Sequence, residues 1–244
     1  MAEKRQVILF GYGSFGQHLY KYLRASGHNV KVISRLEENT LLGESHKIDI
    51  QRINFKKNDE ILALGIDPKK HLLYCAMNKT AQNLFLVLTL RTLYPEAQII
   101  AISNSAENAR KLRYAGANNV IDLYESTARR ITHNLVKPAV TKAIDEIIYH
   151  RSDIKMAELM IPRGSYLDGK HLSEIDLKSI GLIIIAIIDK EMGSEVLVTD
   201  RRIDHRLDEG DILVIIGKEQ DIEKFRVYIT RKETPAPHTR EHYA

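Results

Sequence analysis

Three glycines near the start of the chain have the spacing of a phosphate-binding turn. Gly11, Gly13 and Gly16 follow the apolar run 6–10 and precede a helical pattern over 17–25. In such a turn the first glycine permits a tight bend, the second lets a phosphate approach the backbone, and the third lets helix and strand pack closely. The helix N-terminus offers unpaired N–H groups to an anion. The pattern predicts a Rossmann-type nucleotide-binding half; the alternative is a glycine turn kept for packing alone.

The end of the predicted second strand, over 30–33, lacks the acidic residue that usually accepts hydrogen bonds from a ribose. Ser34 and Arg35 occupy this place, and the next carboxylate is Glu37. A guanidinium attracts a phosphate that a carboxylate would repel. The pair therefore favours a ligand with a phosphate near the ribose, or else weakens ribose recognition. An Arg35 side chain that simply points to solvent is the other interpretation.

No group of residues stands out as catalytic. Tyr74 is followed four residues later by Asn78, where a short-chain dehydrogenase would need a lysine. No predicted helix carries two histidines at metal-ligand spacing. The single cysteine, Cys75, excludes an internal disulfide and follows an apolar run, so we expect a buried thiol. The acids around Gly210 are typical of a turn that leads into a strand. We predict no catalytic residue and no metal ligand.

The composition fits a globular protein that binds neither nucleic acid nor a membrane directly. The 244 residues are 44% hydrophobic and 28% charged, with a formal net charge of +4. No block of lysine and arginine reaches the five or six like charges of a nucleic-acid or membrane arm. No apolar run approaches the roughly 18–20 residues that span a bilayer. We therefore expect a cytoplasmic protein.

The first part of the chain alternates short apolar strands with helices. Strands are predicted over 6–10, 30–33, 48–55, 71–76, 97–102 and 119–121, and helices over 17–25, 58–64, 80–93 and 105–114. This alternation indicates an α/β fold with a mostly parallel sheet and helices on both faces. Residues 1–135 are therefore predicted to form a Rossmann-like lobe that binds a nucleotide or another ligand.

The pattern changes in the second part of the chain. Helices are predicted over 125–136 and 139–149, and Pro138 separates them. We interpret 136–152 as a helical crossover and a dimer contact. Residues 153–230 are predicted to form a small α+β domain, with strands over 154–161, 182–188, 196–198 and 212–216 and a helix over 219–228. The polar tail over 231–244 is expected to be disordered.

Taken in order, these motifs resemble the RCK family (regulator of conductance of potassium) over about residues 5–229. The resemblance rests on the glycine turn, on the helices across Pro138, and on four segments: 78–84, 114–121, 165–172 and 207–215. Members of this family are cytosolic ligand-sensing subunits or domains of potassium channels and transporters. A dehydrogenase would not be expected to carry the C-terminal module.

The resemblance implies a non-enzymatic regulator whose N-terminal lobe binds an adenine nucleotide, ATP/ADP or NAD(P), or a cation. It implies a homodimer through the crossover helices, and a ring, typically of eight lobes, that acts on the membrane domain of a potassium channel or transporter. The protein would then lie at the inner face of the cell membrane.

The resemblance also implies which residues line the nucleotide. They are Gly11, Tyr12, Gly13, Ser14, Phe15 and Gly16 at the phosphates, Ser34 and Arg35 at the ribose, Ala76, Met77 and Asn78 at the adenine side, and Glu125 near the terminal phosphate or its metal. The chain departs from the family in two respects. The acid at the second strand is absent, and residues 54–57 and 76–79 carry amides and lysines where calcium-gated members carry carboxylates.

Two other functions remain open from the sequence. The first is a small NADP-dependent oxidoreductase that uses Ser34 and Arg35. The second is a cyclic-dinucleotide sensor that acts through the C-terminal lobe, with the ligand held between two copies near residues 161–163. Arg163 could stack on a base there, although residues 162–164 also have the composition of a plain turn. An empty Rossmann site kept for assembly is a further alternative.

Overall fold

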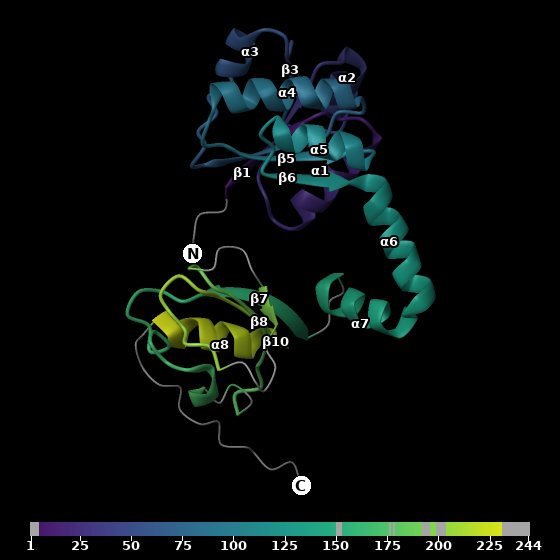
Figure 1. The fold of residues 1–244 in the computed structure, drawn as a ribbon. Helices are drawn as coiled ribbons and strands as arrows, with labels where there is room; N and C mark the ends of the chain where they lie inside the picture. The colour runs from purple at the N-terminus through teal and green to yellow at the C-terminus, as the bar shows by residue number, and fades with distance from the viewer. Residues whose placement is uncertain are drawn as a thin grey trace. The chain divides into compact units, whose positions relative to one another are not determined.

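The computed structural model describes residues 5–149, 153–175, 177, 179–191, 196–198 and 204–230. The predicted disordered tail over 231–244 and the last residues of the predicted crossover, 150–152, lie outside this set. The chain divides after Leu135 into two compact units, which are described separately below (Figure 1). Among the described residues, no helix is both long and apolar enough to cross a bilayer.

The N-terminal unit is built on a six-stranded parallel sheet. The strands are β1 (Gln6–Phe10), β2 (Val30–Ser34), β3 (Ile50–Arg52), β4 (His71–Cys75), β5 (Gln98–Ser103) and β6 (Asn119–Asp122), in the order β3-β2-β1-β4-β5-β6. Chain order reverses between β1 and β4, which is the place where open α/β sheets bind ligands. The predicted Rossmann-like fold is confirmed.

Helices cover both faces of this sheet. They are α1 (Ser14–Ala25), α2 (Glu37–Ser45), α3 (Asn58–Leu62), α4 (Thr80–Leu93) and α5 (Ala106–Tyr114). Figure 1 shows α4 and α5 side by side over one face. Ile8 and Phe10 of β1 belong to the core beneath α3, α4 and α5, whereas Val7 and Leu9 belong to the core that α1 closes. A strand buried on both faces requires the uninterrupted apolar run that the sequence shows.

Two elements near the β3 edge differ from the prediction. Helix α2 was not expected, because its turns carry the exposed Leu41 and Leu42 and it shows little amphipathic pattern. The extended segment predicted over 48–55 contains only the three residues of β3. Beyond them, Ile53 and Phe55 turn into the core under α3 and α4, so their burial comes from loop packing and not from strand pairing.

The helices α6 (Leu123–Val136) and α7 (Pro138–Tyr149) follow the sheet. Helix α6 begins two residues earlier than predicted, because the Asp122 carboxylate accepts a hydrogen bond from the Glu125 N–H at 3.0 Å and caps the first turn. Pro138 stands at the first position of α7, where its missing N–H costs nothing. The structure describes every residue of α6, and none of them is buried.

The C-terminal unit contains a four-stranded antiparallel sheet. The strands are β7 (Ile154–Met160), β8 (Ile183–Ile188), β9 (Val196–Val198) and β10 (Ile212–Lys218), in the order β7-β10-β8-β9. Helix α8 (Glu219–Thr230) buries Ile222, Phe225 and Ile229 in the same core as Leu213 and Ile215 of β10. The predicted α+β architecture of this part is confirmed.

Candidate functional site

The glycine turn, defined here as residues 11–16, joins β1 to α1 against the end of β4. Gly11 has a φ of +108°, a conformation that side chains disfavour. A Cβ added to Gly11 would lie 2.6 Å from the carbonyl oxygen of Ala76. The two strand ends are also tied by a 2.8 Å hydrogen bond from the Ala76 N–H to the Phe10 carbonyl. The structure therefore brings Gly11 and Ala76 together.

The other two glycines of the turn have different neighbours. A Cβ on Gly16 would overlap the Gly11 carbonyl oxygen, a backbone atom that cannot move aside without opening the turn. A Cβ on Gly13 would overlap only the amide group of Asn78, an exposed side chain that can rotate. Gly13 has a φ of −72°, which any residue can adopt. Gly16 is thus required by packing against backbone, whereas Gly13 makes room for the Asn78 amide beside the first turn of α1.

The side chains within the turn divide between the core and the surface. Tyr12 is buried, its ring packs edge-on against Tyr20 at 6.2 Å between centroids, and burial raises the pKa of its phenol. Phe15 packs against the same core. Ser14 is exposed at the start of α1, whose first turn contains no acidic residue. What the turn can present to an anion is therefore its backbone N–H groups and the Ser14 hydroxyl.

Asn83 on α4 holds the loop that follows β4. This residue is 1% exposed, and its side-chain oxygen accepts a hydrogen bond from the Met77 N–H at 2.9 Å. Its amide group donates to the Ile102 carbonyl at 3.0 Å, which ties the ends of β4 and β5 together. We did not predict this role. The signal was present, because Asn83 stands at helical spacing from the buried Leu86 and Leu90.

Only one of the three residues predicted for the adenine side is exposed. Ala76 and Met77 are buried, and Met77 belongs to the core beneath α4. Asn78 is exposed and lies against the glycine turn. Cys75, just before them, is 1% exposed, and burial raises the pKa of its thiol well above the ordinary value. The expectation of a buried thiol fits this environment, in which a thiol reacts poorly.

Ser34 does not present its hydroxyl to a ligand. The residue is 1% exposed, and its oxygen accepts a hydrogen bond from the Leu36 N–H and donates one to the Leu36 carbonyl, both at 3.2 Å. These bonds close the tight turn that ends β2. The exposed Arg35 follows directly, so the turn positions this guanidinium at the surface.

Arg35 lines a hollow of about 390 Å³ at the carboxyl ends of β2 and β3. We call it the arginine hollow; its lining residues are Arg35, Arg52, Ile53, Asn54 and Glu60. Arg52 is ion-paired with Glu37 at 2.8 Å. The Glu60 carboxylate accepts the Asn54 N–H at 2.7 Å and pairs with Lys57 at 3.1 Å, and these contacts lower its pKa.

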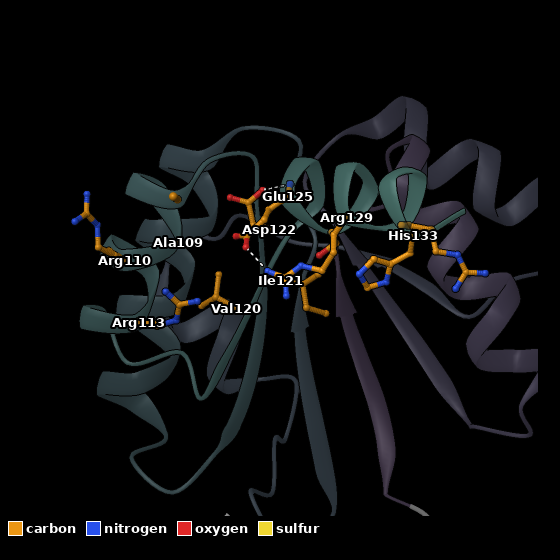
Figure 2. A pocket seen from close by; sticks show the side chains of 12 residues that line it. Ala109, Arg110, Arg113, Val120, Ile121, Asp122, Glu125, Arg129 and His133 are labelled. Carbon is orange, nitrogen blue, oxygen red and sulfur yellow. Dashed lines mark hydrogen bonds and ion pairs between the residues drawn. The ribbon is translucent and has the colours of Figure 1, made fainter. Parts of the chain in front are cut away.

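Glu125 lies in a different depression, a groove of about 780 Å³ between α5, β6 and α6. Figure 2 shows Arg110 and Arg113 extending from α5 on one side of it and Arg129 and His133 from α6 on the other. The Glu125 carboxylate pairs with Arg129 at 2.6 Å. In the strand order, β6 is three positions from β1, or about 14 Å at the usual strand spacing. The N-terminal unit therefore does not bring Glu125 to the glycine turn.

The C-terminal unit contains two of the predicted turns. Gly164 has a φ of +67°, and Ser165 N–H donates to the Pro162 carbonyl, so residues 162–165 form a turn with Arg163 exposed near Glu209 at 3.8 Å. Gly210, with a φ of +97°, occupies the predicted turn into β10. There the buried Asp211 accepts the N–H groups of Lys190 and Asp208 at 3.0 Å and lies 3.3 Å from His205.

These contacts give the Asp211 carboxylate a capping role in the turn, which agrees with the interpretation of these acids as turn formers. Among the described residues, no group of three or more His, Cys, Asp or Glu side chains has the arrangement of a metal site.

Comparisons with known proteins cover both units. The model of the TrkA-N domain matches residues 7–123, and the model of the TrkA-C domain matches residues 156–230. The chain is 25% identical over 240 residues to "Probable potassium channel protein 2" of Methanocaldococcus jannaschii. This alignment covers 94% of the chain and 68% of that protein. It is 23% identical over 226 residues to "Potassium channel protein 1" of the same organism, covering 91% and 66%. The chain thus spans about two thirds of the length of these relatives.

One solved structure shows the fold over almost the whole chain. The human SLO3 gating ring superposes with a TM-score of 0.66 at 11% sequence identity, covering 90% of this chain and 46% of that one. At this identity the similarity concerns the fold alone.

Proposed function

The chain belongs to the RCK family, because it carries a TrkA-N domain followed by a TrkA-C domain, and from this premise we propose that it is a ligand-sensing regulator of a potassium channel or transporter. The order of the two domains carries the proposal. Relatives named as potassium channel proteins support it, since the similarity to them extends over 94% and 91% of the chain. In this proposal the protein lies on the cytoplasmic side of the membrane and acts on the membrane domain of its transport partner.

The ligand that we propose for the N-terminal unit is an adenine nucleotide, ATP/ADP or NAD(P). Its phosphates would bind the N–H groups at the start of α1, beside Gly13 and Ser14. The place over Gly13 supports this, because only the exposed Asn78 amide occupies it, and this amide can rotate to meet a ligand. Arg35 would face the ribose. We do not place Glu125 at this nucleotide within one subunit, since it lies at the far side of the sheet.

The partner that we propose for α6 and α7 is a second copy of the chain. Both helices expose large apolar side chains: Tyr124, Ile131, Leu135 and Val136 on α6, and Val140, Ile144 and Ile148 on α7. A helix without buried residues has little reason to remain folded in water unless another surface covers it. Dimers formed in this way would assemble further into a ring, which we propose to have eight lobes.

Regulation would follow from the nucleotide's unequal affinity for two arrangements of the dimer. A ligand shifts such an equilibrium only as far as its affinities for the two states differ. A coupling of about 1–3 kcal/mol would change the ratio of open to closed pores by roughly 5- to 150-fold. No chemical step is part of this proposal. An NADP-dependent oxidoreductase would instead show steady hydride transfer to a carbonyl substrate, which absorbance at the nicotinamide band would detect.

The experiment that tests the nucleotide site compares Gly13→Asp with Asn29→Asp. Each variant adds one carboxylate. Asn29, however, is exposed in the turn before β2, at the amino ends of the strands, whereas the glycine turn lies at their carboxyl ends. Thermal shift and calorimetry against ATP, ADP, NAD(H), NADP(H) and a cyclic dinucleotide should show one preferred adenine nucleotide. A ligand at a hundred times its dissociation constant adds about 2.7 kcal/mol to the free energy of unfolding.

Gly13→Asp should abolish that response, and Asn29→Asp should keep it. Unchanged binding by Gly13→Asp would show that the glycine turn is not the site. A response to the cyclic dinucleotide alone, lost in Arg163→Gln, would favour the C-terminal sensor instead.

The experiment that tests the dimer compares Leu135→Glu with Asn134→Glu by light scattering during size exclusion. Both residues are exposed on α6, but only Leu135 belongs to the apolar set. We expect Leu135→Glu to elute as a monomer and Asn134→Glu as the wild-type oligomer. An oligomer that Leu135→Glu leaves unchanged would remove α6 from the interface.

A further inference from the structure

Two arginines occupy the place beside the glycine turn where a nucleotide's adenosine ribose would lie. β2 is the direct neighbour of β1, and the Gly11 N–H donates to the Ile33 carbonyl at 2.8 Å. In the register of the sheet, Ser34 pairs with Arg52. Arg35, one residue further, and Arg52 therefore lie at the same edge of the sheet as the turn, on the first and second strands away from it.

The charges in the arginine hollow are unequally compensated. Arg52 is already paired with Glu37, and Glu60 is already occupied by Lys57 and by the Asn54 backbone. Within the part of the chain that the structure describes, Arg35 makes no hydrogen bond or ion pair. A guanidinium that is held at the surface by a buried turn, with no carboxylate of its own, is suited to an anionic ligand.

The buried turn at Ser34 also explains why the arginine hollow is poorly suited to a ribose that carries no phosphate. A ribose with free 2′- and 3′-hydroxyls is normally held by a carboxylate at the end of the second strand. Here the side chain at that position is the Ser34 hydroxyl, which is buried and hydrogen-bonded to the N–H and the carbonyl of Leu36. Among the described residues, the end of β2 thus offers a ribose no exposed side-chain acceptor, whereas the hollow offers a phosphate the unpaired Arg35 and, beside it, Arg52, which is shared with Glu37.

We propose that the nucleotide bound by this protein carries a phosphate on its adenosine ribose, as NADP(H) does, and that Arg35, assisted by Arg52, binds that phosphate. The inference rests on the proposed nucleotide site at the glycine turn and adds the ligand class that the site selects. Asn54 also lines the hollow and provides a further polar group beside the two arginines.

The test compares the affinities of NADP(H) and NAD(H) by calorimetry at one ionic strength. Adenosine 2′,5′-bisphosphate and 5′-AMP serve as a smaller pair that differs only in the 2′-phosphate. We expect the phosphorylated member of each pair to bind at least about tenfold more tightly, as one charge-assisted contact provides. Arg35→Gln should reduce this preference about tenfold, and it should change the affinity for NAD(H) less than twofold. Arg52→Gln should reduce the preference less, because Arg52 is shared with Glu37.

The matched control is Arg110→Gln, an exposed arginine on α5 at the far side of the sheet, which should leave all affinities unchanged. Equal or tighter binding of NAD(H) by the wild-type protein would overturn the inference and leave the nucleotide site intact. A preference for NADP(H) that persists in Arg35→Gln would overturn the assignment of this residue. Absence of binding by all four compounds would also overturn the inference, and the nucleotide site itself would then stand or fall with the binding of ATP and ADP and its loss in Gly13→Asp.

Discussion

The glycine turn and the arginine hollow lie on neighbouring strands, yet they are built from different parts of the chain. The turn is made of backbone: Gly11 fits against the Ala76 carbonyl, and Gly16 fits against Gly11. The hollow is made largely of side chains near the surface: that of Arg52 is 55% exposed, and that of its ion-pair partner Glu37 is 68% exposed. The first region therefore cannot tolerate a side chain at Gly11 or Gly16, whereas the residues of the second can change without loss of the fold.

The rate at which a thiol reagent labels a cysteine should show the largest difference between the two regions. Cys75, at the end of β4 beside the glycine turn, provides the cysteine of the first region. Its thiol is buried beside Phe10 and its pKa is raised by burial, so it reacts only when the sheet opens. We expect labelling by a thiol reagent near pH 8 to be slower by at least about a thousandfold than in the unfolded chain.

Gln51→Cys supplies the comparison with the hollow, because Gln51 is exposed on β3. This variant should label in two phases, one fast and one slow. A wild-type protein that labels as fast as denatured chain would show that β4 is not protected.

Gly16→Ala should destabilise the protein although its backbone conformation is helical. Helix propensity alone predicts that alanine stabilises α1 by about 1 kcal/mol relative to glycine. The overlap with the Gly11 carbonyl oxygen reverses the sign, and we expect a loss of about 3 kcal/mol in the free energy of unfolding.

Urea denaturation measures this loss, with Gly65→Ala as the control. Gly65 has a φ of +64° but nothing within 4 Å of an added Cβ, so only the backbone conformation opposes alanine there. Its cost should be about 1 kcal/mol. Equal losses at both positions would mean that close packing does not explain Gly16.

Asn83→Leu tests the connection between the turn and the rest of the sheet. The substitution keeps the volume approximately and leaves the Met77 N–H and the Ile102 carbonyl without their side-chain partner. A buried polar group left unpaired costs about 1–3 kcal/mol, and we expect a loss in that range by thermal unfolding. Nucleotide affinity should fall as well, because residues 76–79 lose their anchor. A stable variant with wild-type affinity would show that Asn83 does not position this loop.

Glu37→Gln should have the smallest effect on stability of these substitutions, and it should raise the affinity for the nucleotide where Asn83→Leu lowers it. The pair with Arg52 is exposed, so its loss should change the free energy of unfolding by less than about 1 kcal/mol. The released guanidinium should raise the affinity for a 2′-phosphorylated nucleotide a few-fold.

Glu107→Gln is the matched control, since it removes a similarly exposed pair with Lys111 on α5. It should affect stability equally and binding not at all. A fall in the affinity of Glu37→Gln for the phosphorylated nucleotide would contradict the assignment of Arg52.

The sequence predicted the turn better than the hollow, for a physical reason. Backbone-defined features follow from local pattern: an apolar strand, three spaced glycines and a helix leave few alternatives. The exposure of Arg35 was open in the sequence, because it depends on the burial of Ser34 and on where β3 pairs. Asp122 also left a readable signal, since it precedes Glu125 by three residues in the manner of a helix cap.

The position of Glu125 could not be derived in the same way. Its distance from the turn depends on the strand order, which places two strands, β4 and β5, between β1 and β6. A residue assigned to a site by resemblance alone carries no information about that separation. Helix α2 was missed because its residues show little apolar periodicity, and its place beside β3 comes from tertiary contacts.

The position of β1 in the middle of the sheet has a consequence for how the chain folds during synthesis. One edge of β1 can pair as soon as β2 has been made, but its other edge pairs with residues 71–75. Until these residues leave the ribosome, an apolar strand of five residues shows an unpaired edge, which other chains can join. The strand β1, which supports the glycine turn in the finished protein, is thus prone to aggregation in the nascent chain. Slow translation before residue 75 would prolong the time for which its edge is unpaired.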